Sequence, residues 1–177
     1  MGKVSLKNEP VAWGDGLLVA AQGDNITAIY VDPENDLGVE QTITRTSNVT
    51  GSILLTDADG VEQMNFPSGS TLYVQVTDAD RNADSGTAET VTATVTSATE
   101  TTGETVTLTE TGANTGIFMG SITFAVGAAS SGDGILQVTV GDNITGSYTD
   151  PTDDYGNELT VTDGAIYGAN AVSGTLI

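Results

Sequence analysis

The sequence contains no cysteine and no histidine among its 177 residues. Disulfide bonds, thiol nucleophiles, imidazole bases and nearly all transition-metal sites are therefore excluded, and only hard oxygen ligands remain for a metal. Basic residues are also scarce, because 4 Lys and Arg stand against 24 Asp and Glu, which gives a net charge of −20. A charge of this sign and size excludes nucleic acid and anionic membrane surfaces as electrostatic partners and favours cations.

Long apolar runs are absent as well. The sequence has no stretch of about 18 apolar residues, and its N-terminus has no basic region followed by an apolar stretch. It therefore predicts neither a membrane-spanning helix nor an uncleaved signal peptide. It also offers no pair of nucleophile and base, so we expect no enzymatic activity.

What the sequence does contain is a repeat with a period of 118 residues. Residues 23–38, GDNITAIYVDPENDLG, return at residues 141–156 as GDNITGSYTDPTDDYG. The match extends back without a gap to Met1, and after a five-residue insertion residues 49–53 correspond to residues 172–176. This phasing predicts half a repeat, one whole repeat and the opening strand of a third.

The repeat divides the chain into three expected segments. Residues 1–48 are a half repeat with the later strands of a module, residues 49–164 are a complete module, and residues 165–177 are a candidate donor strand. β-Branched residues alternate with polar ones over much of the length, which is typical of half-buried strands. Their rhythm predicts an all-β fold, specifically an immunoglobulin-like antiparallel β-sandwich. The expected strands are residues 4–7, 17–22, 26–31, 41–46, 52–56, 62–66, 72–77, 90–96, 105–109, 117–124, 135–140 and 144–149.

Three runs carry a resemblance to a known type of repeat: SGSTLYVQVTDADRNAD at residues 68–84, ETVT at 89–92 and TETGANTGIF at 109–118. The chain resembles, over nearly its whole length, the tandem immunoglobulin-like repeats of bacterial and archaeal extracellular proteins. The resemblance implies a structural role outside the cell or at its surface, with frequent calcium binding and no catalytic residue. Adhesins, stalks, surface layers and fibres all contain such repeats, so the motifs specify the repeat type more than the function.

The sharpest ligand pattern is the stretch DADRNADSGTAE at residues 78–89. Oxygen-bearing side chains occupy its positions 1, 3, 5, 7 and 12, which is the ligand spacing of a calcium loop. Ala83 stands where the sharp turn of such a loop needs Gly, and strands flank the stretch, so a solvated acidic turn is the alternative. The candidate ligands are Asp78, Asp80, Asn82, Asp84 and Glu89.

Other acidic loops are candidates for the same type of ion. If successive strands alternate in direction, the turn at 57–59 and the loop at 110–114 lie at the same end of the sandwich as the calcium loop. The Asp-Pro loops at 32–36 and 150–154 then lie at the opposite end. Each of these is a second candidate calcium site, with a plain Asp-capped turn as the alternative. The additional candidate ligands are Asp57, Asp59, Glu110, Asp32, Asp36, Asp150, Asp153 and Asp154.

These features together predict a secreted structural subunit that polymerises with other copies of itself. An unpaired sheet edge in the half repeat, and an apolar strand without a module at residues 165–177, form a template for strand addition between copies. We expect head-to-tail assembly into a calcium-stabilised fibre or surface layer. In one alternative the tail folds back and closes a monomer. In another the chain is a calcium-dependent adhesin module whose acidic loops bind a carbohydrate or a surface protein.

Overall fold

The structure of the protein, a computed structural model, describes residues 5–7, 17–19, 26–33, 38, 40–46 and 48–168. Their regular secondary structure is β-strand apart from one 3-10 turn, which confirms the all-β prediction. The elements are β1 (Ser5–Lys7), β2 (Leu17–Val19), β3 (Thr27–Asp32), β4 (Gln41–Thr46), β5 (Ser52–Thr56), β6 (Asn65–Phe66), β7 (Thr71–Thr77), the 3-10 turn η1 (Ala79–Arg81), β8 (Thr90–Ser97), β9 (Glu104–Glu110), β10 (Ile117–Val126), β11 (Ile135–Val138), β12 (Asn143–Asp150) and β13 (Leu159–Tyr167). In this part of the chain no helix is long and apolar enough to cross a membrane.

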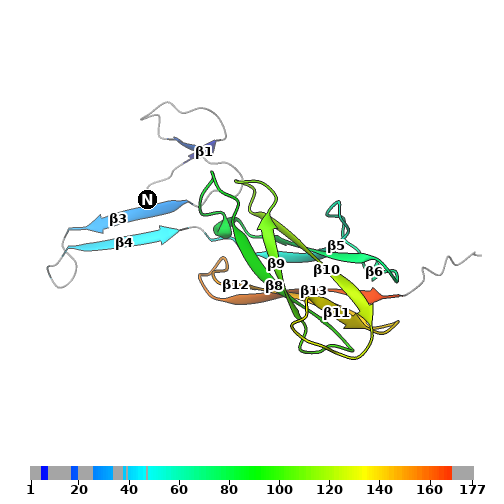
Figure 1. Ribbon diagram of the computed structural model, residues 1–177. Coiled ribbons are helices and arrows are strands. Elements are labelled where there is room, and N and C mark those ends of the chain that lie inside the picture. Colours follow the sequence, from blue (N-terminus) through cyan, green and yellow to red (C-terminus); the bar gives the residue numbers. More distant parts are fainter. Residues whose placement is uncertain are drawn as a thin grey trace, which may run out of the picture.

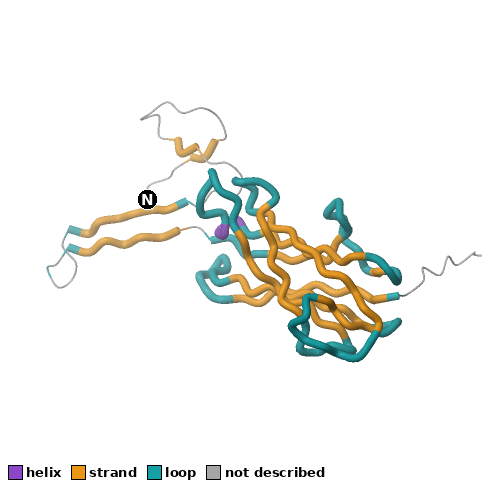
Figure 2. Tube along the Cα trace, viewed as in Figure 1, coloured by secondary structure: helices purple, strands orange, loops and turns teal. Residues whose placement is uncertain are grey.

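Strands β5 to β13 form one nine-stranded sheet that folds over on itself like a sandwich (Figures 1 and 2). The strand order is β5-β7-β10-β9-β8-β12-β13-β6, with β11 paired to β10. The two ends of this order meet across the fold, because the Leu55 N–H donates to the Asp163 carboxylate at 2.7 Å. A side chain therefore satisfies a backbone donor of β5 at the point where the sheet closes on itself.

The core of the sandwich follows from the two-residue period of its strands. In β7, Leu72, Val74 and Val76 are buried while the residues between them are partly exposed. Successive side chains of a strand point to opposite faces, so alternating apolar residues make one continuous inner face. The largest apolar side chains that are fully buried are Phe118, Leu55, Leu72, Leu108, Leu136 and Ile144.

Two pairings in this sheet are parallel, β10 with β11 and β6 with β13. The short β6 joins the far end of the sheet, so β5 and β7 are direct antiparallel neighbours. The turn at residues 57–59 therefore lies at the opposite end of the sandwich from Asp78, and its expected placement is wrong. Because β10 and β11 run in the same direction, simple alternation also fails before β12. The loop at residues 150–154 consequently lies at the same end as Asp78, which again corrects the expectation.

The first strand pair of the half repeat has the same register as a pair in the complete module. Ser5 pairs with Leu17 in the parallel pair β1–β2. The residues 118 positions later, Thr123 and Ile135, pair in the parallel pair β10–β11. The structure therefore gives both copies of this sequence the same local backbone arrangement.

The second pair of the half repeat, the hairpin β3–β4, also has the register of its counterpart in the complete module. Thr27 pairs with Thr46 in this hairpin, and Thr145 pairs with Gly164 at the equivalent positions of β12–β13. Figure 1 shows β3 and β4 extending away from the sandwich as a separate two-stranded ribbon. Within the described ranges the hairpin pairs with no further strand, whereas β12–β13 also pairs with β8 and β6.

The last strand of the complete module, β13, continues past the boundary expected at residue 165 and ends at Tyr167. Ala165 and Tyr167 are buried at the end of β13, where β13 still pairs with β12 and, in parallel, with β6. The alternation of inward and outward side chains simply continues to Tyr167. The complete module therefore includes residues 165–167, and residues 169–177 of the candidate donor strand lie outside the described residues.

Candidate functional site

The clearest difference between the two copies is the environment of one tyrosine. Tyr148 in β12 is 3% exposed and belongs to the core, whereas Tyr30, 118 positions earlier in β3, is 60% exposed. Both occupy the same register position of the same hairpin. The sequence of the half repeat therefore specifies a buried face, and the described residues do not cover it.

In the complete module, β5 and the residue before it cover this face. A Cβ atom on Gly51 would lie 3.0 Å from Cε1 of Tyr148, so Gly51 packs directly on the ring. A Cβ atom on Gly146 would meet the side chains of Leu55 at 2.7 Å and Ile53 at 3.2 Å. β5 pairs by backbone hydrogen bonds with β7 and lies against β12 through side chains. The equivalent face of β3 has Ala28 and Tyr30 exposed.

The other face of β3 is also apolar. Ile29 is 66% exposed and Val31 46%, whereas the equivalent residues of β12 are the polar Ser147 and Thr149. A two-stranded ribbon with large apolar side chains on both faces is marginal on its own in water. The hairpin β3–β4 is therefore the surface of the described chain that most requires a partner.

A second feature lies where the half repeat joins the module. The backbone N–H groups of residues 49, 50 and 51 donate to the carboxylates of Asp80, Asp154 and Asp150 at 3.0, 2.9 and 2.7 Å. Hydrogen bonds to charged acceptors are about twice as strong as neutral ones. We call Asp80, Asp150 and Asp154 the junction clamp, because they fix the backbone that leads into β5.

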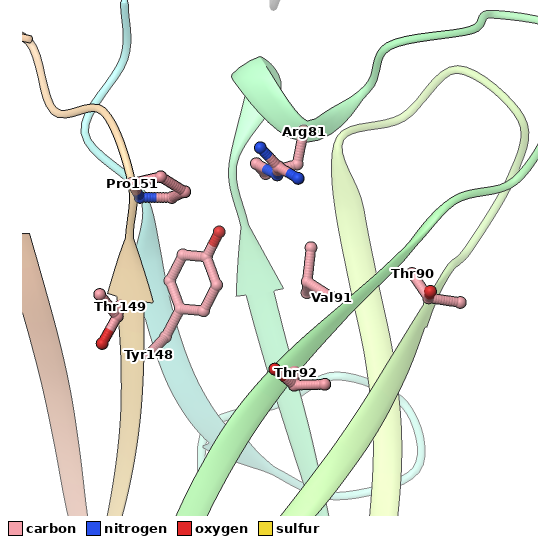
Figure 3. A pocket seen from close by; sticks show the side chains of 7 residues that line it. All are labelled: Arg81, Thr90, Val91, Thr92, Tyr148, Thr149 and Pro151. Atoms are coloured by element: carbon pink, nitrogen blue, oxygen red, sulfur yellow. The ribbon is translucent and has the colours of Figure 1, made fainter. Parts of the chain in front are cut away.

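Asp78 lies behind the junction clamp and is fully buried. Its carboxylate accepts hydrogen bonds from the Tyr148 hydroxyl at 2.7 Å and from the Asp80 N–H at 3.0 Å. Figure 3 shows the Tyr148 hydroxyl directed toward the turn that carries Arg81. Burial raises the pKa of Asp78, and the nearby Asp150 raises it further, although the hydrogen bond from Tyr148 opposes the shift. Burial and the Asp78 hydrogen bond also raise the pKa of Tyr148.

The junction clamp concentrates negative charge. Burial raises the pKa of Asp80, and the charges of Asp150 and Asp154 add to this rise, while the Val49 N–H lowers it. A carboxyl group with a raised pKa in the folded state stabilises the fold at low pH and loses that contribution as the pH rises through its folded pKa. The clamp therefore brings together carboxylates whose mutual repulsion a bound cation would reduce.

The predicted calcium loop contributes to a separate acidic group. The Glu110 carboxylate accepts hydrogen bonds from the N–H groups of Thr115 and Gly116, both at 2.7 Å, and from Glu89 at 3.4 Å. Glu89 in turn accepts from the Asp84 N–H at 2.6 Å, and its carboxyl group lies within hydrogen-bonding reach of Glu110. Burial acts to raise the pKa of Glu110, but the backbone donors outweigh it and the net shift is downward.

One oxygen atom of this acidic group, Oε2 of Glu89, is buried without a hydrogen-bond donor among the described residues. Oδ1 of Asn82 in the same predicted calcium loop is also buried without a donor there, and the amide nitrogen of Asn82 donates to Asn114 at 2.7 Å. Unsatisfied buried oxygens beside a pair of carboxylates suit a hard cation. Nevertheless, within the described ranges no group of three or more acidic side chains is arranged to hold a metal ion.

The remaining candidate ligands cap their own turns. Asp57 accepts hydrogen bonds from the N–H groups of Asp59 and Val61, both at 3.0 Å. Asp153 accepts from the N–H groups of residues 155 and 157, both at 2.8 Å. These arrangements are the plain turns given as the alternative. The side chains of Asp32 and Asp36 lie outside the described residues.

The candidate ligands did not include two other buried carboxylates, Glu100 and Glu104. Glu104 binds the N–H groups of residues 132, 133 and 134, and Glu100 binds the N–H of Gln137 at 2.9 Å. A signal for Glu104 was present, because it alternates with Val106 and Leu108 on the inward face of β9. An acidic residue at an inward position of a strand indicates a carboxylate that ties a loop to the core.

Replacing Glu110 with glutamine is expected to weaken the fold at neutral pH and to reduce its sensitivity to acid. The lowered pKa of Glu110 means that its stabilisation is complete above about pH 5 and is lost as the pH falls through the folded pKa. Losing one set of charge-assisted hydrogen bonds costs about 1.5–3 kcal/mol. Urea unfolding between pH 3 and 7 measures both effects, with the exposed Glu62→Gln as control. Equal pH profiles for the two variants would contradict this role.

Comparison with known proteins gives no family. A scan against models of known protein families finds no match. A search of the curated proteins also finds no relative.

Proposed function

We propose that the protein is a secreted structural subunit that assembles head to tail with other copies into a calcium-stabilised extracellular fibre or surface layer. In this assembly a neighbouring copy covers the hairpin β3–β4 of each subunit. The observation that carries the proposal is the 60% exposure of Tyr30 against 3% for Tyr148 at the equivalent position. A face with the sequence of a core surface gains most when a second molecule removes it from water.

The geometry of the hairpin favours association with another strand or module. Among the described strands β3 pairs only with β4, so its other edge pairs with no described strand. In the complete module the equivalent edge of β12 pairs with β8. Exposed edge strands are templates for pairing with another chain. The hairpin and its cover are different surfaces, so the contact is heterologous and repeats into an open polymer unless it closes into a ring.

Calcium belongs to the proposal because the complete module collects carboxylates with almost no basic residues to balance them. Arg81 is the one basic residue between positions 48 and 168 of the sequence. The buried oxygen of Glu89 beside Glu110, and the carboxylates of the junction clamp, are two places where a divalent cation would offset repulsion.

Calcium is expected to raise the melting temperature of the protein, and a chelator is expected to lower it. Binding to the native state alone adds about 2.7 kcal/mol at a hundredfold excess over the dissociation constant. Glu89→Gln removes a proposed ligand, so its calcium-dependent shift should be much smaller than that of Glu62→Gln, which changes the charge equally at an exposed site. Calorimetry with calcium, with magnesium and with chelator measures the shifts. An identical response of both variants would remove Glu89 from the site, and no response of the unaltered protein would refute calcium binding.

Electron microscopy of the purified protein tests the assembly itself. We expect filaments or sheets with calcium, and shorter or fewer particles after chelation. Uniform single particles at high protein concentration with calcium present would refute the proposed function. Assemblies that are unchanged after chelation would support the structural role and would show that calcium is not needed for it.

A further inference from the structure

We infer that residues 172–176 of a second copy pack on the inner face of β3 in the register in which residues 49–53 pack on β12. This inference rests on the proposed function and specifies its contact. The occupant is a segment of the chain itself, because residues 49–53, VTGSI, and residues 172–176, VSGTL, match position by position. Its receptor is the hairpin whose register equals that of β12–β13.

The glycine in this segment is the most specific part of the match. Gly51 lies against the Tyr148 ring so closely that a Cβ atom would be 3.0 Å from Cε1 and 3.2 Å from the Asp78 carboxylate. Real Cβ atoms seldom approach other atoms this closely, so the contact favours glycine over any residue with a side chain. The corresponding residue of the segment is Gly174, and the corresponding ring is Tyr30. The pairing of this glycine with this tyrosine therefore recurs in the sequence at positions 174 and 30.

The apolar residue two positions later completes the contact. Ile53 is 5% exposed in the complete module and approaches Gly146. Its equivalent in the segment is Leu176, and the equivalent of Gly146 is Ala28, which is exposed on β3. Ala28 carries a Cβ where one on Gly146 would lie 3.2 Å from Ile53, so the Leu176 side chain must shift slightly from the position of Ile53 to keep this apolar contact. Burying Leu176 against Ala28 and Tyr30 would thus cover the inner face of the hairpin as β5 covers β12.

This register differs from strand addition at the sheet edge. β5 hydrogen-bonds to β7, and its contact with β12 is made by side chains together with the Gly51 N–H bond to Asp150 at 2.7 Å. A segment placed like β5 therefore lies across the face of β3. It does not occupy the edge of β3 that corresponds to the β12 edge paired with β8. The geometry predicts close approach of residues 28 and 176, and none between residues 27 and 176, because Thr27 points to the opposite face.

Cysteine crosslinking between two copies tests the register, since the chain has no cysteine of its own. The variant Ala28→Cys is mixed with the variant Leu176→Cys at equal concentration with calcium and then treated with a short bifunctional thiol reagent. Such a reagent joins two thiols whose side chains face each other, without the close Cβ approach of about 4.5 Å that a disulfide needs. We expect a crosslinked heterodimer on a non-reducing gel from this mixture. The control mixture, Thr27→Cys with Leu176→Cys, places the first thiol on the outer face and should yield far less product.

The outcomes separate this inference from the proposed function. If the mixed variants form filaments but crosslink no better than the control, the register is wrong and the structural role stands. If sedimentation and microscopy show only monomers, the proposed function fails as well. The double variant Ala28→Cys/Leu176→Cys tests fold-back: a crosslink within single monomers, with none between mixed single variants, would establish a closed monomer and overturn both. The expected heterodimer from the mixture supports both.

Discussion

Tyr148→Ala is expected to lower the free energy of unfolding of the module by about 3–5 kcal/mol, the usual cost of removing a buried aromatic ring. Tyr148 is 3% exposed, and its hydroxyl is a donor to the buried Asp78 carboxylate at 2.7 Å. Removal of the ring leaves a cavity beside Gly51 and a buried carboxylate with one donor fewer. The substitution therefore combines two of the known causes of large destabilisation.

The same substitution at Tyr30 is the matched control. It removes the same side chain from the same position of the repeat, but from a site that is 60% exposed. We expect the unfolding free energy of the module to change by less than about 0.5 kcal/mol. Urea unfolding in the presence of chelator, followed by far-UV circular dichroism, measures both variants as dispersed protein. Equal destabilisation by the two variants would contradict the assignment of Tyr30 to an uncovered face.

Much of the fold was predictable because strand sequences alternate with a period of two. β5, β7, β8, β9 and β12 begin and end within one residue of the expected ranges. Strand direction was not predictable from this period. The short β6 contributes two residues to the far end of the sheet, and β11 runs parallel to β10. The direction and pairing of β6 and β11 depend on which strands meet in three dimensions. A count that assumed alternating directions therefore placed the loops at residues 57–59 and 150–154 at the wrong end of the sandwich.

The acidic loops show why ligand spacing alone is a weak guide. The spacing of residues 78–89 matches a calcium loop, yet the structure divides these residues between two places. Asp78 and Asp80 turn toward the junction and bind Tyr148 and the N–H of Val49, while Glu89 lies beside Glu110. A carboxylate binds backbone donors as readily as it binds a cation, and the sequence does not distinguish the two. The local backbone decides, and here it forms the η1 turn after Asp78.

Removal of residues 169–177 is expected to prevent assembly while the module stays folded. Residues 165–167 must be kept, because Ala165 and Tyr167 are buried parts of β13 and a cut at residue 165 would damage the core. A milder variant, Leu176→Asp, should weaken the contact by about 2 kcal/mol, roughly thirtyfold, because the proposed contact buries this side chain. Thr175→Asp adds the same charge at the neighbouring position, which faces away from β3 in the proposed register, and serves as control.

Sedimentation velocity of the full chain and of the form without residues 169–177, each with calcium and at several concentrations, tests the assembly most directly. Head-to-tail assembly predicts that the full chain sediments as a concentration-dependent series of large species. It predicts that the shortened form sediments as a single monomer with an unchanged melting temperature of the module. Large species of the same size from both proteins, or a full chain that remains monomeric at the highest concentration, would contradict it.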